Sequence, residues 1–168
     1  MSNGSLGERA GRVIDACRRA GAKLATAESC TGGLVAATLT EIAGSSDVLE
    51  RGFVTYSNEA KTEQLGVPAS EIALYGAVSE EVARAMAEGA LARARAEIAV
   101  AVTGIAGPGG GSATKPVGLV HIACARRGGA TLHERHTFAG DRAAVRRASV
   151  ERALAMIMLQ VEKRAPSS

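Results

Sequence analysis

Hydrophobic residues recur along this chain in two kinds of pattern. Over residues 31–42 they recur at helical spacing, whereas the continuous apolar runs at 23–27 and 97–103 are typical of buried strands. The same criteria predict helices over 5–19, 59–65, 79–95 and 141–163, and strands over 52–57, 117–125 and 131–138. The buried faces of the two longest helices are predicted at Val82, Met86, Ala90 and Ala94, and at Val150, Ala153, Leu154, Ile157 and Val161.

Capping residues indicate where several of these helices begin and end. N-caps are predicted at Ser5, Asn58, Ser79 and Asp141, and C-terminal glycines at Gly21 and Gly66. The segment GSSD at 44–47 is predicted to be a turn. The elements therefore follow the order α-β-α-β-α-α-β-β-β-α.

This order predicts an α/β fold with three layers, α/β/α, as a single domain over residues 1–168. The sheet is expected to be mixed, because the last two strands read as an antiparallel hairpin. In open sheets of this kind, ligands bind beyond the carboxyl ends of the strands. The chemistry is therefore sought at the residues that follow each strand.

Composition restricts how the core can pack and which partners the chain can bind. The chain has 20 glycines but only two Phe, two Tyr and no Trp. Such a core must rely on close backbone approach and aliphatic packing. Too few rings exist to form a stacking platform for single-stranded nucleic acid. The net charge of +3 is concentrated in the C-terminal third, which predicts either attraction of an anion or an ordinary solvated helix face.

Several other classes are disfavoured by the sequence. No run of 18 apolar residues predicts a membrane span, and the N-terminus carries charges where a signal peptide needs an apolar stretch. Cys17, Cys30 and Cys124 form no CxxC pair, and the three histidines form no metal motif. We therefore expect a cytoplasmic protein without a metal site.

A hydroxyl side chain lies directly after the first predicted strand, in Glu28-Ser29-Cys30-Thr31-Gly32-Gly33. A nucleophile needs an exposed oxygen beside donors that can hold an oxyanion, and a strand-to-helix turn provides both. Ser29 or Thr31 could equally be a simple helix cap. Cys30 is the alternative nucleophile, although a small buried cysteine is the more common case.

A long glycine-rich loop, residues 104–116, follows the predicted central strand. It matches neither the P-loop nor the dinucleotide-binding pattern. Its amides could still face a phosphate or an oxyanion, and loops of this length are usually functional rather than plain connections.

Two further candidates lie near other strand ends. Lys61 follows Tyr56 by five residues, and a buried lysine can become a general base, which arginine cannot. Lys61 could also be an ordinary surface residue. Arg142 lies in the first turn of the last predicted helix, where the helix dipole disfavours a cation unless it shares an anion or an ion pair with Asp141 or Glu151.

Six segments in this order resemble one family. They read ATAESCTGGLVAATLT (25–40), IAGSSDVLERGFVTYSNEAK (42–61), GAVSEEVARAMAEGAL (76–91), AVAVTGIAGPGGG (99–111), KPVG (115–118) and FAGDRAAVRRA (138–148). Together they resemble the C-terminal domain of the competence- and damage-inducible protein CinA. Its stand-alone relatives are nicotinamide mononucleotide (NMN) deamidases of the PncC type. The resemblance covers about residues 5–162.

The resemblance implies that the chain hydrolyses the carboxamide of NMN to nicotinate mononucleotide and ammonia, a salvage step that needs no cofactor. On this basis we hypothesise Ser29 as nucleophile and Lys61, helped by Tyr56, as base, with Cys30 or a directly attacking water as the alternatives to Ser29. The residues implied in substrate and oxyanion binding are Thr31, Gly32, Gly33, Thr103, Gly104, Ile105, Ala106, Gly107 and Arg142. The N-terminal domain of larger CinA proteins, linked to ADP-ribose pyrophosphatase activity, is not expected here.

Other functions remain open at this point. The chain could be a nucleotide-binding regulatory module of the competence or DNA-damage response without turnover, or a nucleic-acid binder that uses its basic last helix. The scarcity of aromatic residues disfavours the second. Met156 and Leu159 lie outside the apolar stripe of the last predicted helix and predict a surface for homo-oligomers.

Overall fold

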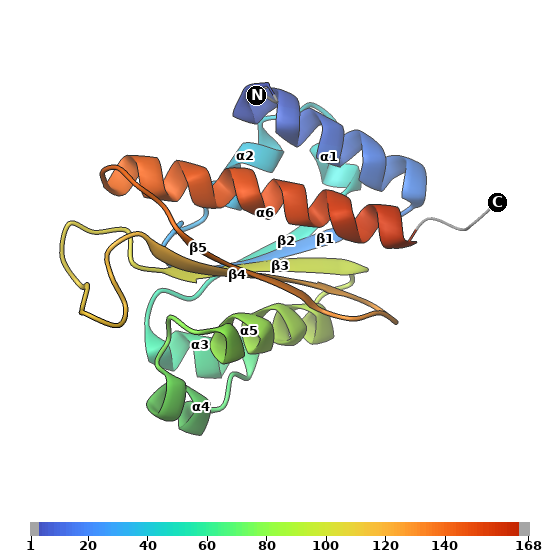
Figure 1. Ribbon diagram of the computed structural model, residues 1–168. Helices are drawn as coiled ribbons and strands as arrows, with labels where there is room; N and C mark the ends of the chain where they lie inside the picture. Colours follow the sequence, from blue (N-terminus) through green and yellow to red (C-terminus); the bar gives the residue numbers. More distant parts are fainter. Residues whose placement is uncertain (1–3, 165–168) are drawn as a thin grey trace.

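The computed structural model describes residues 4–164, which form one mixed five-stranded sheet with helices on both faces (Figure 1). The strands are β1 (Leu24–Glu28), β2 (Leu49–Val54), β3 (Ile98–Gly104), β4 (Leu119–Arg126) and β5 (Leu132–Thr137). Their order in the sheet is β2-β1-β3-β4-β5. Strand β1 is parallel to β2 and β3, whereas β4 is antiparallel to β3 and β5. The predicted mixed sheet is confirmed.

Two groups of helices cover the sheet. Helices α1 (Leu6–Ala20), α2 (Leu34–Thr40) and α6 (Arg142–Arg164) lie on one face, and α3 (Asn58–Leu65), α4 (Ala69–Tyr75) and α5 (Glu80–Arg93) lie on the other (Figure 1). A short 3₁₀ helix spans Ser45–Asp47. None of these described helices is both long and apolar enough to cross a bilayer. The three-layer α/β/α prediction is therefore confirmed.

The two halves of the core differ in residue size. On the α1/α6 face, strand residues such as Ile98, Val102 and Ile122 pack against aliphatic helix residues. On the α5 face, β1, β3 and β4 present alanines: Ala25, Ala27, Ala99, Ala101, Ala123 and Ala125. This layer of methyl groups lets α5 lie close to the sheet. We call these six residues the alanine face of the sheet.

Glycine extends this close packing to the contact between α5 and α3. A Cβ atom at Gly89 of α5 would overlap the carbonyl oxygen of Leu65, the last residue of α3. Only a residue without a side chain fits at that position. Lys61 lies one turn before Leu65, so this contact also helps to fix the helix that carries Lys61.

Most of the predicted N-caps and both predicted apolar stripes of the helices are confirmed. The hydroxyls of Ser5 and Ser79 accept from the amides of Glu8 and Val82, and the Asp141 carboxylate accepts from the amide of Ala144. Both predicted apolar stripes are buried.

Four predictions were wrong in detail. Ser57, not Asn58, caps α3, because its hydroxyl accepts from the amide of Ala60. Helix α4, which follows Pro68, was missed. Strand β2 begins and ends three residues earlier than predicted. Helix α2 begins at Leu34 rather than residue 31, because the two preceding glycines adopt positive φ.

The predicted self-association surface is only partly exposed. Met156 is fully buried in the core, so its prediction as a surface residue was wrong. Leu159 on the same helix is 40% exposed. It remains the only exposed member of the predicted pair.

Candidate active site

The end of β1 places Ser29 at the carboxyl edge of the sheet. The Ser29 amide donates to the carbonyl of Val102 on β3 (2.9 Å), and the Ser29 carbonyl accepts from the amide of Gly32 (3.0 Å). A tight turn is thus closed directly after the strand. Gly32 and Gly33 have φ of 58° and 106°, a region that glycine adopts without the strain other residues incur. The turn redirects the chain into α2.

Two charged side chains fix this turn from outside. The buried carboxylate of Glu28 accepts from the amides of Val35 (2.8 Å) and Ala36 (3.1 Å) in the first turn of α2. An acceptor there satisfies N–H groups that have no partner within the helix. From the opposite side, Arg146 of α6 donates to the carbonyls of Cys30 (3.2 Å) and Thr31 (3.0 Å). Glu28 and Arg146 therefore both form hydrogen bonds to backbone groups of the turn and of the start of α2.

Lys61 reaches the Ser29 hydroxyl from α3. Its Nζ lies 3.0 Å from Ser29 Oγ and 2.9 Å from the Thr55 carbonyl, and it also contacts the carbonyls of Tyr56 and Ser57. Only 1% of Lys61 is exposed, and no carboxylate of the described residues forms an ion pair with it. Burial disfavours the charged ammonium and so lowers the pKa of Lys61. A lysine in this state can accept a proton from a hydroxyl.

Tyr56 and Arg142 lie at the mouth of the same site. Arg142 Nη2 donates to the Tyr56 hydroxyl (3.0 Å), and Nη1 donates to the Gly107 carbonyl (2.7 Å). Tyr56 is 60% exposed, and its hydroxyl contacts Arg142 rather than Lys61. Arg142 forms no ion pair with a carboxylate of residues 4–164, and Glu151 pairs with Arg147 instead. The guanidinium therefore joins the tyrosine to the glycine-rich loop.

The glycine-rich loop forms the opposite wall. It leaves β3 after Gly104, and the hydroxyl of the preceding Thr103 donates to the carbonyl of Ala77 (2.9 Å). The Ile105 amide donates to the Leu119 carbonyl, and the Gly118 amide donates to the Ile105 carbonyl, so both ends of the loop are tied to β4. Between these ties, the amides of Ala106 and Gly107 donate to no other described residue. They are available to an oxygen of a ligand.

A cavity of about 290 Å³ brings these groups together. Its lining contains the predicted Ser29, Tyr56, Lys61, Arg142 and the segment 103–107. Thr31, Gly32 and Gly33 belong to the turn behind it and are not lining residues. Asn58, Ala77 and Val78 also line the cavity, and none of them was predicted as a site residue. Asn58 lies one helical turn before Lys61, and that spacing was the available signal.

The other candidate nucleophile, Cys30, lines the same cavity, but Lys61 donates no described hydrogen bond to its sulfur. Cys30 is 6% exposed, and its burial raises the pKa of the thiol to about 11. A thiol near neutral pH is therefore protonated, and the thiolate is the reactive form.

No histidine belongs to the site. His121 Nδ1 lies 2.9 Å from His133 Nε2 on the neighbouring strand, and no group of three or more metal-ligating side chains occurs within residues 4–164. The groups available for chemistry in the site are therefore the Ser29 hydroxyl, the Lys61 amine and the backbone amides of Ala106 and Gly107.

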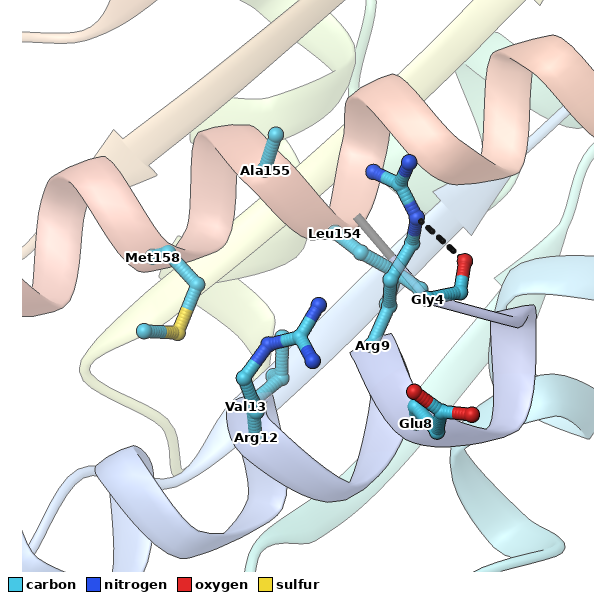
Figure 2. A pocket seen from close by; sticks show the side chains of 8 residues that line it. All are labelled: Gly4, Glu8, Arg9, Arg12, Val13, Leu154, Ala155 and Met158. Atoms are coloured by element: carbon cyan, nitrogen blue, oxygen red, sulfur yellow. Dashed lines mark hydrogen bonds between the residues drawn. The ribbon is translucent and has the colours of Figure 1, made fainter. Parts of the chain in front are cut away.

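A second cavity lies away from this edge, between α1 and α6. Figure 2 shows its lining, with Arg9 and Arg12 on α1 beside the apolar side chains of α6. Its volume is about 500 Å³, and Arg9 donates to the Gly4 carbonyl (3.5 Å). Its described lining residues include no hydroxyl, thiol or lysine side chain. The larger cavity therefore lacks the groups for nucleophilic chemistry.

Comparison with known proteins gives a consistent result. Residues 7–161 match the family described as the CinA C-terminal domain. The chain is 51% identical to nicotinamide-nucleotide amidohydrolase PncC of Escherichia coli K12, over 95% of this chain and 97% of that protein. It is 56% identical to a CinA-like protein of Akkermansia muciniphila over 81% of this chain, which spans only 33% of that protein.

Solved structures agree with the sequence matches. The competence/damage inducible protein CihA from Agrobacterium tumefaciens superposes with a TM-score of 0.92 at 52% identity, over 95% of this chain and 98% of that one. A CinA superfamily protein from Klebsiella pneumoniae superposes with a TM-score of 0.91 at 39% identity. The similarity thus extends over nearly the whole chain.

Proposed function

This chain belongs to the CinA C-terminal domain family, and we propose that it hydrolyses the carboxamide of NMN to nicotinate mononucleotide and ammonia. The observation that carries the proposal is the buried contact of 3.0 Å between Lys61 Nζ and Ser29 Oγ. A hydroxyl and an amine of lowered pKa at this distance suit attack on an amide carbon. Relatives named nicotinamide-nucleotide amidohydrolase, about half identical over most of the chain, support the substrate class.

The first half of the proposed reaction breaks the C–N bond. Neutral Lys61 takes the proton of Ser29 while Oγ bonds to the carboxamide carbon and the carbonyl electrons move onto oxygen. When the tetrahedral intermediate collapses, the C–N bond breaks and protonated Lys61 gives its proton to the departing nitrogen. Ammonia leaves, and an ester remains on Ser29.

The second half removes the ester. Lys61, neutral again, takes a proton from water while the water oxygen attacks the ester carbon. The bond to Ser29 Oγ then breaks, and Lys61 returns the proton to that oxygen. Nicotinate mononucleotide leaves as the carboxylate, and its acid proton passes to solvent. Lys61 therefore serves alternately as base and acid in both halves.

The oxyanion of each intermediate needs hydrogen-bond donors. The Gly32 amide already donates to Ser29, and the amides at the start of α2 donate to Glu28. The amides of Thr31 and Gly33 also have no described acceptor, but these residues do not line the cavity. We therefore assign the donor role to the amides of Ala106 and Gly107, which do line it and have no described partner. Loss of one such donor typically costs about 3–4 kcal/mol of barrier.

Arg142 is the proposed anchor for the 5′-phosphate. It lies in the first turn of α6, at the cavity mouth, with Nη groups directed to neutral acceptors only. Arginine binds phosphate oxygens in a fork geometry. The Tyr56 hydroxyl contacts Arg142, so we assign it to phosphate and ribose binding rather than to proton transfer.

The test is ammonia release from NMN, nicotinamide and NAD by the purified chain, with a reaction that contains no protein as background. We expect ammonia from NMN and none from nicotinamide, which lacks both the ribose and the phosphate. A chain that binds NMN but releases no ammonia above this background would instead be a nucleotide-binding regulatory module.

A further inference from the structure

Arg146 makes contacts that the proposed reaction does not use. Its Nε donates to the Cys30 carbonyl and its Nη2 to the Thr31 carbonyl, at 3.2 and 3.0 Å. It does not line the cavity, and its side chain forms no ion pair with a carboxylate of the described residues. A half-buried guanidinium thus directs its donors to the two peptide groups that follow Ser29.

The backbone of this turn needs contacts from another element to fix its conformation. Before Ser29, the chain is fixed by the strand ladder and by the bond from the Ser29 amide to Val102. After Thr31 come Gly32 and Gly33, both at positive φ, and glycines leave the backbone more freedom than any other residue. Glu28 holds only the amides beyond these glycines. The Thr31 carbonyl also accepts from the Leu34 amide (2.9 Å) within the same turn. Among residues 4–164, Arg146 is the only side chain from another element that binds the backbone between Ser29 and Gly32.

We propose that Arg146 is a positioning residue for the nucleophile, and this rests on the assignment of Ser29 under the proposed function. Held carbonyls at residues 30 and 31 keep the turn closed and keep Ser29 Oγ at 3.0 Å from Lys61 Nζ. In a trans peptide the N–H points opposite to the C=O, so Arg146 also turns the Thr31 amide away from α6. Displacement of a reacting group by about 1 Å can cost about 100-fold in rate.

The experiment compares Arg146→Met, Arg146→Lys and Arg147→Met. Methionine keeps much of the apolar stem and removes the donors, whereas lysine keeps a cation that can reach one carbonyl. Arg147 is the matched control, because it is the next residue of α6, is exposed and pairs only with Glu151. Three quantities are measured: kcat and KM for NMN, thermal unfolding, and amide hydrogen exchange by mass spectrometry across residues 29–36.

For Arg146→Met we expect a kcat about 10–100-fold lower, with KM within about threefold, because the loss affects the reacting geometry and not substrate binding. Exchange should become faster across residues 29–36 and stay unchanged in β3 and in α6. Arg146→Lys should recover part of kcat, and Arg147→Met should behave as wild type. A purely structural role would instead lower unfolding temperature and raise exchange throughout the chain.

The proposal is wrong if Arg146→Met keeps wild-type kcat and exchange, or if its whole loss is in KM. It is also wrong if the faster exchange spreads over the whole chain. Hydrogen exchange needs no substrate, so it separates this proposal from the proposed function. If wild type releases no ammonia from NMN while Arg146→Met loosens only residues 29–36, the substrate assignment fails and the positioning of the turn stands.

Discussion

Lys61 has an unusual environment for a lysine, because it lies among backbone carbonyls and one hydroxyl without a carboxylate. Neutral carbonyls can accept from either the ammonium or the amine, so they do not hold the charged form as a carboxylate would. Burial then lowers the pKa of Lys61 below its ordinary value. The residue can therefore act as a base at a pH where exposed lysines cannot.

The first prediction concerns the pH dependence of activity. Since the neutral amine is the active form, kcat/KM for NMN should rise with pH, with a midpoint below the ordinary lysine pKa of about 10.4. The Lys61→Arg variant, whose side chain stays charged, should not show this rise of kcat/KM with pH. Its kcat should be lower than that of wild type by about 100-fold or more. Activity of Lys61→Arg close to wild type would exclude Lys61 as the base.

A second prediction concerns Arg142. If the guanidinium binds the 5′-phosphate, Arg142→Met should raise KM for NMN by about 10–100-fold, the usual worth of charged hydrogen bonds. The same variant should leave KM for nicotinamide riboside, which has no phosphate, nearly unchanged. Steady-state kinetics on both substrates test this. Equal losses on the two substrates would show that Arg142 does not recognise phosphate.

At the scale of elements, the alanine face of the sheet and Gly89 set the distance between the sheet, α5 and α3. A third prediction follows from the lack of space at Gly89. Gly89→Ala places a methyl group against the Leu65 carbonyl and should lower the free energy of unfolding by about 1–3 kcal/mol or more. Urea unfolding measures this change.

Gly11 supplies the matched control for that prediction. It also lies inside a helix, but the nearest atom to an added Cβ is Ile42 Cδ1 at 4.0 Å, an ordinary contact. Gly11→Ala should therefore stabilise the protein by about 0.5–1 kcal/mol, through helix propensity alone. Two glycine-to-alanine changes with the same sign would contradict the close packing of α5 on α3.

Local signals were sufficient for most elements but not for all. Strand runs such as 97–103 and caps such as Ser79 could be predicted because their patterns are local. Helix α4 is short, with only Ile72 buried, so its apolar pattern is too weak to detect. Asn58 was misassigned because Ser57, a good cap, directly precedes it.

In the candidate site, too, some features could be predicted from local sequence and others could not. Ser29, Lys61 and Arg142 were selected because strand ends concentrate chemistry, but the sequence could not show which atoms meet. The contact of Tyr56 with Arg142 joins residues 86 positions apart. The hydrogen bonds from Arg146 to the carbonyls of Cys30 and Thr31 join residues that are 115 or more positions apart. Such contacts depend on how α6 packs over the sheet, and no local pattern encodes that packing.

For the whole molecule, the contact between buried His121 and half-buried His133 links β4 and β5 and affects acid stability. His121 is 7% exposed, and burial, with the nearby His133, Arg135 and Lys115, lowers its pKa from 6.5 to about 4. The opposing influence is the Glu80 carboxylate, which lies near His133. In the unfolded chain His121 takes up a proton at higher pH than in the folded protein.

The fourth prediction is therefore a loss of stability in acid. Between about pH 6.5 and pH 4 the unfolded state binds more protons, so the free energy of unfolding should fall as pH falls, by on the order of 2–3 kcal/mol. Urea unfolding at pH 7 and pH 4.5 measures the change. His121→Asn should flatten this dependence, and an unchanged slope would mean that other groups cause it.

The central claim for the molecule is that Ser29, and not its neighbour, attacks the carboxamide of NMN. The most direct measurement is kcat for ammonia release from NMN by Ser29→Ala and Cys30→Ala, with wild type alongside. We predict that Ser29→Ala loses about 1,000-fold or more, while Cys30→Ala stays within about tenfold, because its thiol is protonated and takes no part. A Ser29→Ala protein that deamidates NMN at nearly the wild-type rate, or a loss found only in Cys30→Ala, would contradict it.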